Sequence, residues 1–309
     1  MMAIRRKNLV TEGDSFWKLN GANVIASQSD FYQHLAESKH LSFTIYQPDE
    51  LTRIVKNRTQ RIEEVTFEEV SFSKTKIFDV IFRGCTFKKC QLIATTFENC
   101  EFHGCKFIST NTHKIAFRKT YIDPLSFDKC LDWKKHQNIG VHLYQALMNN
   151  SHDEEQIEFE RDAQFLFFRW KRYQDGYEVR RTWTNAKTAK ERFFIIRTSG
   201  KVLRRLGWEK LFGCGIRMRY FLRTIIVVLA MTTFMNFGLR NEFGLLLDGE
   251  PISTWSEAFY FTTVSLTTLG YGDITPSTSL GRLVASIQSI FGFSLFALLA
   301  SMFFRRVAP

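Results

Sequence analysis

The sequence lacks the short motifs that mark the common classes of enzyme. Its 309 residues contain no phosphate-binding loop, no nucleophile elbow and no HExxH zinc motif. No apolar stretch follows the basic residues Met1 to Lys7, so they do not form a secretory signal peptide. We therefore expect a protein that is not an enzyme, has no cofactor and keeps its N-terminus in the cytoplasm.

Long apolar runs are also scarce. A mean hydropathy of −0.16 excludes a chain that lies in a membrane throughout, and a large soluble part must exist. Two segments, Tyr220–Leu239 and Leu280–Phe304, are nevertheless apolar and long enough to cross a bilayer core, which takes about 20 residues. We predict that these segments are two transmembrane helices.

Basic residues are missing between these two segments. Asn241 to Thr254 contains three acids and no Lys or Arg, whereas Arg180 to Arg223 contains 13 Lys and Arg against two acids. An excess of Lys and Arg marks the cytoplasmic side of a membrane. We therefore expect an integral protein of the cell (inner) membrane with both termini in the cytoplasm. With a net charge of +11, anionic membrane lipids are the expected partner of the basic segment, rather than nucleic acid.

A glycine-rich run lies between the predicted spans, after a short predicted helix from Thr254 to Thr268. The run reads Thr267, Thr268, Leu269, Gly270, Tyr271, Gly272 and Asp273. Successive carbonyl groups can all face one axis only if the backbone alternates between conformations that glycine adopts most easily. A ring of such carbonyls can replace the water around a potassium ion, and non-helical backbone at membrane depth is tolerated where it lines an aqueous path.

Residues from about Arg219 to Arg306 resemble the pore of two-transmembrane bacterial potassium channels, the KcsA-like family. The run matches the family's TTVGYGD signature with Leu269 in place of valine, and Gly281 to Ala285 matches the start of its inner helix. The resemblance implies a homotetramer with a re-entrant pore helix. It also implies a filter that binds K+ through its carbonyls, formed by Thr268, Leu269, Gly270, Tyr271 and Gly272.

The same resemblance implies roles for residues around the filter. Gly292 stands where the family carries its gating-hinge glycine, although close helix packing is an alternative reason for a glycine there. Asp273 needs a partner because Val264 replaces a glutamate found in some members, and we predict the Tyr260 hydroxyl. The predicted filter supports are Tyr260, Thr267 and Asp273, and the predicted pore-lining or gate residues are Phe296, Ala300 and Phe304.

A different period governs the N-terminal half. From Ile62 to Phe127 an apolar residue recurs at every fifth position, broken only at Thr112, and a compact residue stands two positions before each centre from Phe67 on. Neither a helix nor an alternating strand has a period of five, so a solenoid is expected. The pattern is similar to the pentapeptide-repeat family, which implies a right-handed quadrilateral β-helix of about three and a half coils.

The cysteines follow this pattern. Cys85, Cys90, Cys100, Cys105 and Cys130 occupy the compact position, where cysteine acts as a small hydrophobic residue. Zinc binding by the two Cys-x4-Cys pairs is a weaker alternative, because the spacing differs from that of most zinc sites.

The predicted organisation is multidomain. We expect an N-terminal cap region at 1–60, the β-helix at 61–131, an amphipathic helical connector with a basic juxtamembrane segment at 132–215, and an all-α pore domain at 216–309. We expect no ligand-gating domain after Pro309, so control is expected from the solenoid, through an unknown cytoplasmic ligand or protein. Two rival hypotheses remain: a poorly selective cation channel, and a docking scaffold with a membrane anchor.

Overall fold

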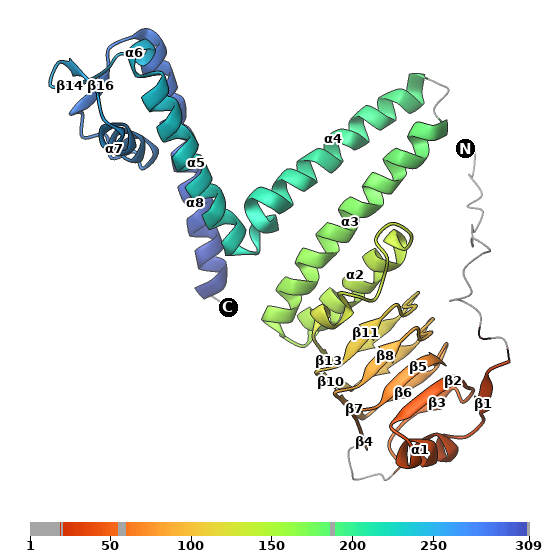
Figure 1. Cartoon of the computed structure of the whole chain (residues 1–309). Helices are drawn as coiled ribbons and strands as arrows, with labels where there is room; N and C mark the ends of the chain where they lie inside the picture. The colour runs from red at the N-terminus through yellow and green to blue at the C-terminus, as the bar shows by residue number, and fades with distance from the viewer. Residues whose placement is uncertain (1–18, 20, 55–59, 186–188, 308–309) are drawn as a thin grey trace. The chain divides into compact units, whose positions relative to one another are not determined.

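A computed structural model describes residues 19, 21–54, 60–185 and 189–307 (Figure 1). The chain divides between Val202 and Leu203 into two compact units, and each is described by itself. The N-terminal unit is a β-solenoid followed by helices, and the C-terminal unit is mainly helical. The solenoid and the two apolar helices predicted from the sequence are thereby confirmed.

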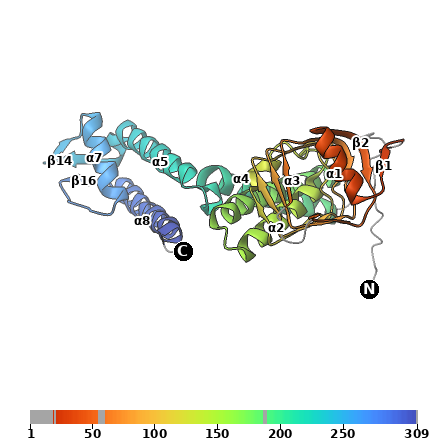
Figure 2. The same cartoon turned by 90° about the horizontal axis from the view of Figure 1, so that it is seen from below.

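Three parallel sheets form three sides of the solenoid, seen from its side in Figure 1 and from below in Figure 2. The first sheet contains β1 (Asn23–Ile25), β2 (His40–Tyr46), β5 (Thr66–Ser71), β8 (Thr86–Lys88) and β11 (Lys106–Ile108). The second contains β3 (Glu50–Leu51), β6 (Lys76–Phe78), β9 (Thr96–Glu98) and β12 (Ala116–Arg118). The third contains β4 (Gln60–Glu63), β7 (Val80–Arg83), β10 (Glu101–His103) and β13 (Tyr121–Ile122). Single bridges from Ser71 to Gln91 and from Gln91 to Asn111 mark the fourth side.

The solenoid begins earlier than residue 61, which the sequence pattern had given as its start. Leu41 pairs with Phe67, 26 positions later, whereas Phe67 pairs with Phe87, 20 positions later. Leu41, Tyr46 and Leu51 therefore form the centres of a first coil that carries six extra residues before Ile62. Their five-residue spacing is visible in the sequence, but the extra residues break the series.

From Glu64 to Lys119, each corner of the coils is turned by a residue in the left-handed region. The positive φ angles fall two positions after the pentad centres, as at Glu69, Lys89 and Lys119 with φ of 56°, 51° and 46°. Only Gly84 and Gly104 fill such corners with glycine. Because a non-glycine residue is disfavoured there, the hydrogen bonds between coils must compensate for the strain.

The centre residues stack along the solenoid axis to form its core. Phe87 lies between Phe67 and Phe107, with ring centroids 4.9 and 4.8 Å away, and Phe107 continues onto Phe127 at 4.1 Å. Phe82 and Phe102 form a neighbouring stack at 4.8 Å. Thr112, the break in the apolar series, is fully buried at the same kind of position.

The compact position serves as a hydrogen-bond donor between coils. The Cys90 Sγ donates to the carbonyl of Phe67 at 3.3 Å, and the Thr95 Oγ1 donates to that of Phe72 at 2.7 Å. Cys85, Cys100, Cys105, Thr110 and Thr120 make equivalent bonds 23 positions back. A small side chain with a donor therefore satisfies this position, and the predicted burial of the five cysteines is confirmed. Leu125 stands at a compact position of the sequence pattern, two residues before Phe127, but it is exposed because it lies in a 3-10 helix, Pro124–Phe127.

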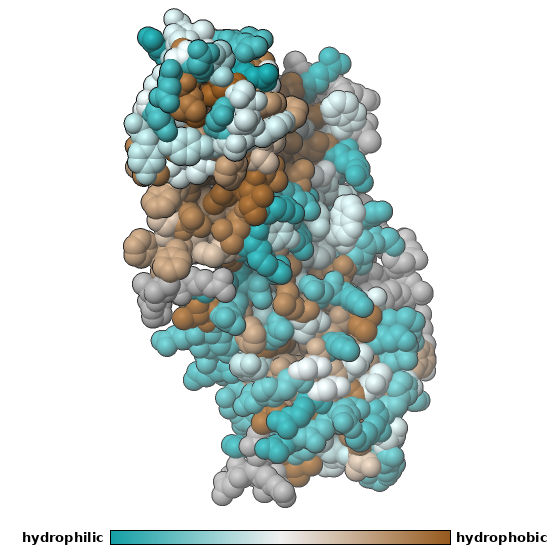
Figure 3. Space-filling view, turned by 60° about the vertical axis from the view of Figure 1, so that its left-hand side comes forward, coloured by the Kyte–Doolittle hydropathy of each residue, from teal (hydrophilic) through white to brown (hydrophobic). Residues whose placement is uncertain are grey.

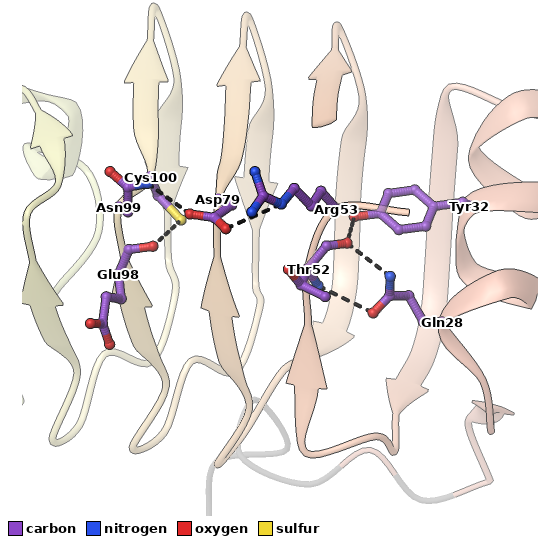
Figure 4. A network of polar contacts seen from close by, with 8 residues as sticks. All are labelled: Gln28, Tyr32, Thr52, Arg53, Asp79, Glu98, Asn99 and Cys100. Atoms are coloured by element: carbon purple, nitrogen blue, oxygen red, sulfur yellow. Dashed lines mark hydrogen bonds and ion pairs between the residues drawn. The ribbon is translucent and has the colours of Figure 1, made fainter. Parts of the chain in front are cut away.

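A helix closes the first coil. Helix α1 (Gln28–Glu37) places Phe31, which is fully buried, against Phe67 and Phe72. Figure 4 shows how its polar residues are fixed: the Tyr32 hydroxyl donates to the Thr52 carbonyl at 2.8 Å, and Gln28 both donates to and accepts from the Thr52 backbone. The predicted cap region thus contains both a cap and a coil.

A helical pair covers the other end. Helices α2 (Gln137–Asp153) and α3 (Ile157–Asn185) pack against each other, and α2 also contacts β12. The Asn150 Oδ1 accepts from the Thr120 N–H at 3.1 Å while its Nδ2 donates to the Thr120 carbonyl at 2.7 Å. This side chain therefore supplies the two hydrogen bonds that a further strand would offer at that point.

The basic connector is largely helical. Helix α4 runs from Ala189 to Phe212, and the boundary between the two compact units falls inside it. Residues 186–188, part of the predicted basic segment, lie outside the described residues.

The C-terminal unit contains two long apolar helices, α5 (Met218–Gly238) and α8 (Ser279–Val307). Each is long and apolar enough to span a membrane. Between them lie α6 (Arg240–Phe243) and α7 (Trp255–Leu266), together with an antiparallel sheet of β14 (Leu245–Leu247), β15 (Glu250–Pro251) and β16 (Ile274–Pro276). This small sheet is an addition to the all-α domain that the sequence predicted. In Figure 3 the apolar colour concentrates on this unit.

Candidate functional site

The short helix α7 is fixed at its start by a capping box. The Thr254 Oγ1 accepts from the Glu257 N–H at 3.3 Å, and the Glu257 carboxylate accepts from the N–H groups of Ser253 and Thr254 at 2.7 and 3.2 Å. Its buried residues Ala258 and Phe261 join a core with Phe243, Leu245 and Ile274. The helix is therefore held rigidly, and its C-terminus leads directly into the glycine-rich run.

The backbone φ angle alternates in sign along the run. Thr268, Gly270 and Gly272 have φ of 58°, 58° and 82°, and the residues between them do not lie in the positive region. Alternation of this kind allows successive carbonyl groups to face the same side, which is what the sequence argument requires of the backbone. A β-branched residue such as Thr268 rarely has positive φ, and such strain is found mainly at functional sites.

The side chains of the run face outward from the single chain. Leu269 is 60% exposed and Tyr271 is 69% exposed. Thr267 is bound back to α7, because its Oγ1 donates to the Thr263 carbonyl at 2.7 Å. The Tyr260 hydroxyl lies near enough to the Asp273 carboxylate of the same chain to interact with it electrostatically, and Val264 is buried on the same helix as Tyr260.

Gly292 lies against the backbone at the end of α7. A Cβ at this position would overlap the carbonyl oxygen of Leu266, so only glycine fits. Gly281 approaches the Phe243 carbonyl in the same manner, and Thr278 holds that turn by donating to the Phe243 carbonyl at 2.9 Å. Helix α8 is continuous through Gly292. Close packing thus explains the glycine by itself, and the hinge role stays a prediction.

The predicted pore-lining residues lie on the second half of α8. Phe296 and Phe304 are each 68% exposed, and Ala300 is partly buried. Leu295 on another side of the helix is buried. Phe296 and Phe304 are therefore left free by the fold of the single chain to face either an axis or lipid.

Three buried polar residues of this unit were missed in the sequence. The Asn236 Nδ2 donates to the Thr262 Oγ1 at 2.8 Å and to the Gln288 Oε1 at 3.2 Å, and the Gln288 Nε2 donates to the Asn236 Oδ1 at 2.9 Å. Polar residues inside predicted membrane helices are a signal of function that could have found Asn236 and Gln288.

Arg223 links α4 to α5. Its Nη2 donates to the Lys210 carbonyl at 2.9 Å, and its guanidinium lies over the Tyr220 ring. The Thr224 hydroxyl likewise bonds the Leu211 carbonyl. Both residues hold the end of α4 to the start of α5.

Three of the buried thiols are poor nucleophiles at neutral pH. Burial raises the pKa values of Cys90, Cys100 and Cys130 to about 12, so these thiols stay protonated at neutral pH. All six cysteines are free. Among the described residues no group of three or more His, Cys, Asp or Glu is placed to hold a metal ion.

Comparison with known proteins bears on the C-terminal unit. Residues 221–308 match the model of a family described as ion channel. A segment of 40 residues is 52% identical to the hyperpolarization-activated voltage-gated potassium channel of Methanocaldococcus jannaschii, covering 13% of this chain and 19% of that protein. A segment of 53 residues is 43% identical to human potassium voltage-gated channel subfamily KQT member 3, covering 17% of this chain and 6% of that protein.

A longer segment of 97 residues is 30% identical to the Drosophila melanogaster potassium voltage-gated channel protein Shal, covering 31% of this chain and 16% of that protein. The chain thus spans a fifth or less of the length of these relatives. The matches and the two apolar helices identify residues 221–308 as an ion-channel domain of an integral membrane protein. The N-terminal unit has the fold that its five-residue repeats predicted.

Proposed function

We propose that the chain is one subunit of a homotetrameric, potassium-selective channel that conducts passively. The observation that carries this proposal is the alternating backbone of Thr268, Gly270 and Gly272, set behind a capped helix in a segment that matches an ion-channel family. The potassium channels among the relatives support the choice of ion.

Four copies of the run would form the conduction path. Their backbone carbonyls from Thr268 to Gly272 replace the water of a K+ ion, with the Thr268 hydroxyl adding oxygens at the inner end. Helix α7 points its C-terminus at the inner side of this path, and the negative end of its dipole favours a cation there. Asp273 and Tyr260 brace the outer end of the filter from behind.

The gate is assigned to α8. Phe304 would form a hydrophobic constriction that closes by losing its water, with Ala300 and Phe296 lining the path above it. A bend at Gly292 would open this constriction. The excess of Lys and Arg before α5 supports a cytoplasmic N-terminal unit and anionic lipids as partners of the basic segment.

The solenoid is assigned a regulatory role through an unidentified cytoplasmic ligand or protein. Its surface is mixed in charge, with ion pairs such as Lys88–Glu68 at 2.8 Å and Lys89–Glu69 at 3.0 Å between successive coils. Deletion of residues 1–131 should change the open probability of single channels and leave the reversal potential unchanged.

Reconstitution of the purified full-length chain into liposomes tests the proposal. We expect tetramers, a K+ flux that barium blocks, and a reversal potential in mixed K+ and Na+ that follows the K+ gradient. A reversal potential near zero would support a poorly selective cation channel instead. Correct tetramers without any flux would support the docking scaffold with a membrane anchor.

A further inference from the structure

The polar cluster of Asn236, Thr262 and Gln288 joins three helices that are otherwise packed through apolar side chains. Asn236 and Thr262 are fully buried, and Gln288 is 5% exposed. They come from α5, α7 and α8, respectively. The cluster is a point at which α5, α7 and α8 meet through hydrogen bonds.

Every polar side-chain atom of the cluster has a partner. Asn236 and Gln288 exchange two hydrogen bonds between their amides, and the second Asn236 N–H reaches the Thr262 hydroxyl. That hydroxyl donates in turn to the Ala258 carbonyl at 2.7 Å, within α7. A fully connected network of this kind defines one relative position of its helices, whereas apolar contacts tolerate small shifts.

A second close contact lies one helical turn further along. Gly292 follows Gln288 by four residues on α8, and Leu266 follows Thr262 by four residues on α7. Gly292 packs against the carbonyl of Leu266, the last residue of α7 before the proposed filter. The two contacts together fix both the depth and the distance of α7 relative to α8.

We propose that Asn236, Thr262 and Gln288 are positioning residues that keep the filter in its conducting geometry. The inference rests on the proposed function, because it concerns the same pore. Thr262 stands six positions before Thr268, so a displacement of α7 moves the first carbonyls of the filter. Bound K+ holds the carbonyls in place, and loss of the cluster makes the filter depend more strongly on that ion.

A purely structural role for the cluster makes a different prediction. Polar side chains are costly in a membrane unless they are paired, and under a purely structural role the cluster is needed only for assembly. Removal of one partner would then lower the yield of tetramers and leave the surviving channels normal. Channels that assemble as tetramers but whose K+ current decays faster would instead indicate that the cluster positions the filter.

The experiment compares Thr262→Val and Asn236→Leu with the full-length wild-type protein. Thr262→Ser keeps the hydroxyl and serves as the rescue variant. Thr233→Val is the matched control, because Thr233 is buried on α5 one turn before Asn236 and its hydroxyl has no partner among the described residues. The measurements are tetramer yield, the decay of K+ current in planar bilayers at low and high external K+, and K+ binding to the detergent-solubilised tetramer by calorimetry.

We expect Thr262→Val and Asn236→Leu to form tetramers whose current decays at least about threefold faster, as the loss of one interhelical hydrogen bond would give. Raising external K+ should slow that decay, and the K+ affinity should fall by a similar factor. Thr262→Ser and Thr233→Val should behave as wild type.

Three results would overturn the inference. Wild-type decay and affinity in assembled Thr262→Val would exclude a positioning role. Failure of both Thr262→Val and Asn236→Leu to assemble, with Thr233→Val assembling, would make the cluster an assembly element only. A wild-type protein that neither binds nor conducts K+ would refute the proposed function itself, and the inference with it.

Discussion

In the solenoid, one chain buries its own repeating side chains, whereas the C-terminal unit leaves its large apolar residues on the outside. Phe67 and Phe97 are fully buried by neighbouring coils of the same chain, but Tyr271 and Phe296 are mostly exposed. Figure 3 shows an apolar band on the C-terminal unit and a largely polar surface on the N-terminal unit. The solenoid buries its core within one chain, whereas the proposed pore would be completed by lipid and by further copies.

The two units also use left-handed backbone for different purposes. In the solenoid a positive φ turns a corner, and lysine, glutamate or asparagine occupies it more often than glycine does. In the proposed filter the positive φ would direct carbonyl groups, and two of the three positions are glycine. Strain in a corner is shared over many coils, whereas strain in the filter is confined to a few residues.

The largest expected effect is on K+ flux, and it distinguishes a glycine of the proposed filter from a glycine at a solenoid corner. Gly272→Ala should reduce K+ flux into liposomes to the background level, because alanine disfavours the φ of 82° that directs the carbonyl. The measurement is the flux of the reconstituted full-length protein.

Gly104→Ala is the matched control. Gly104 has a φ of 63° at a corner, and both glycines have open space where a Cβ would stand. The control should cost about 1 kcal/mol of solenoid stability and leave the flux intact. Equal flux from Gly272→Ala and Gly104→Ala would contradict the distinction.

A middle-sized effect is expected in the solenoid core. Phe87→Ala removes a ring that stacks on both Phe67 and Phe107, and a buried Phe→Ala change costs about 3–5 kcal/mol. Amide hydrogen exchange of the full-length protein should then become faster in the strands that flank residue 87. Phe78→Ala, at a partly exposed position of β6, should change exchange much less. Comparable loss of protection in both variants would argue against a core built on these stacks.

The smallest effect is expected at the compact position. Cys90→Thr should change the free energy of unfolding by less than about 1 kcal/mol at neutral pH, because Thr95 makes the same hydrogen bond in the next pentad. The measurement is hydrogen exchange or denaturant unfolding of the full-length protein across a pH series.

The pH dependence gives this prediction a sign. Burial raises the pKa of the Cys90 thiol from its ordinary value of 9.0 to about 12. The unfolded thiol loses its proton in that range while the folded thiol keeps it, so this contribution to stability is complete below pH 9 and is lost as the pH rises toward 12. Cys90→Thr should lose less stability than wild type over this range. Parallel pH profiles of the two proteins would show that the thiol is not buried in this way.

The sequence predicted the architecture where one physical constraint acts at every repeat. The period of five predicts the solenoid because each side of each coil needs a large residue at the same place. The GYG run predicts the filter because a backbone that alternates in conformation favours glycine. Leu41, Tyr46 and Leu51 follow the same rule, yet six extra residues before Ile62 hide them.

The contacts within the polar cluster could not be predicted from a sequence pattern. Asn236, Thr262 and Gln288 lie in three separate segments, and no local period links them. Their contact depends on how the helices cross, which side-chain patterns in one segment do not specify. The contact of Gly292 with Leu266 has the same origin, so the position of that glycine was predictable but its neighbour was not.

The register between coils restricts how this molecule can change its length. Because Phe67, Phe87 and Phe107 repeat at intervals of 20 residues, removal of one whole coil would bring matching corners, stacks and donors back together. Removal of a single pentad would instead rotate every later side by a quarter of a coil and bring a different side under Asn150. Insertions and deletions inside the continuous coils should therefore survive as whole coils, which makes the solenoid a rod whose length changes in steps of about 4.8 Å.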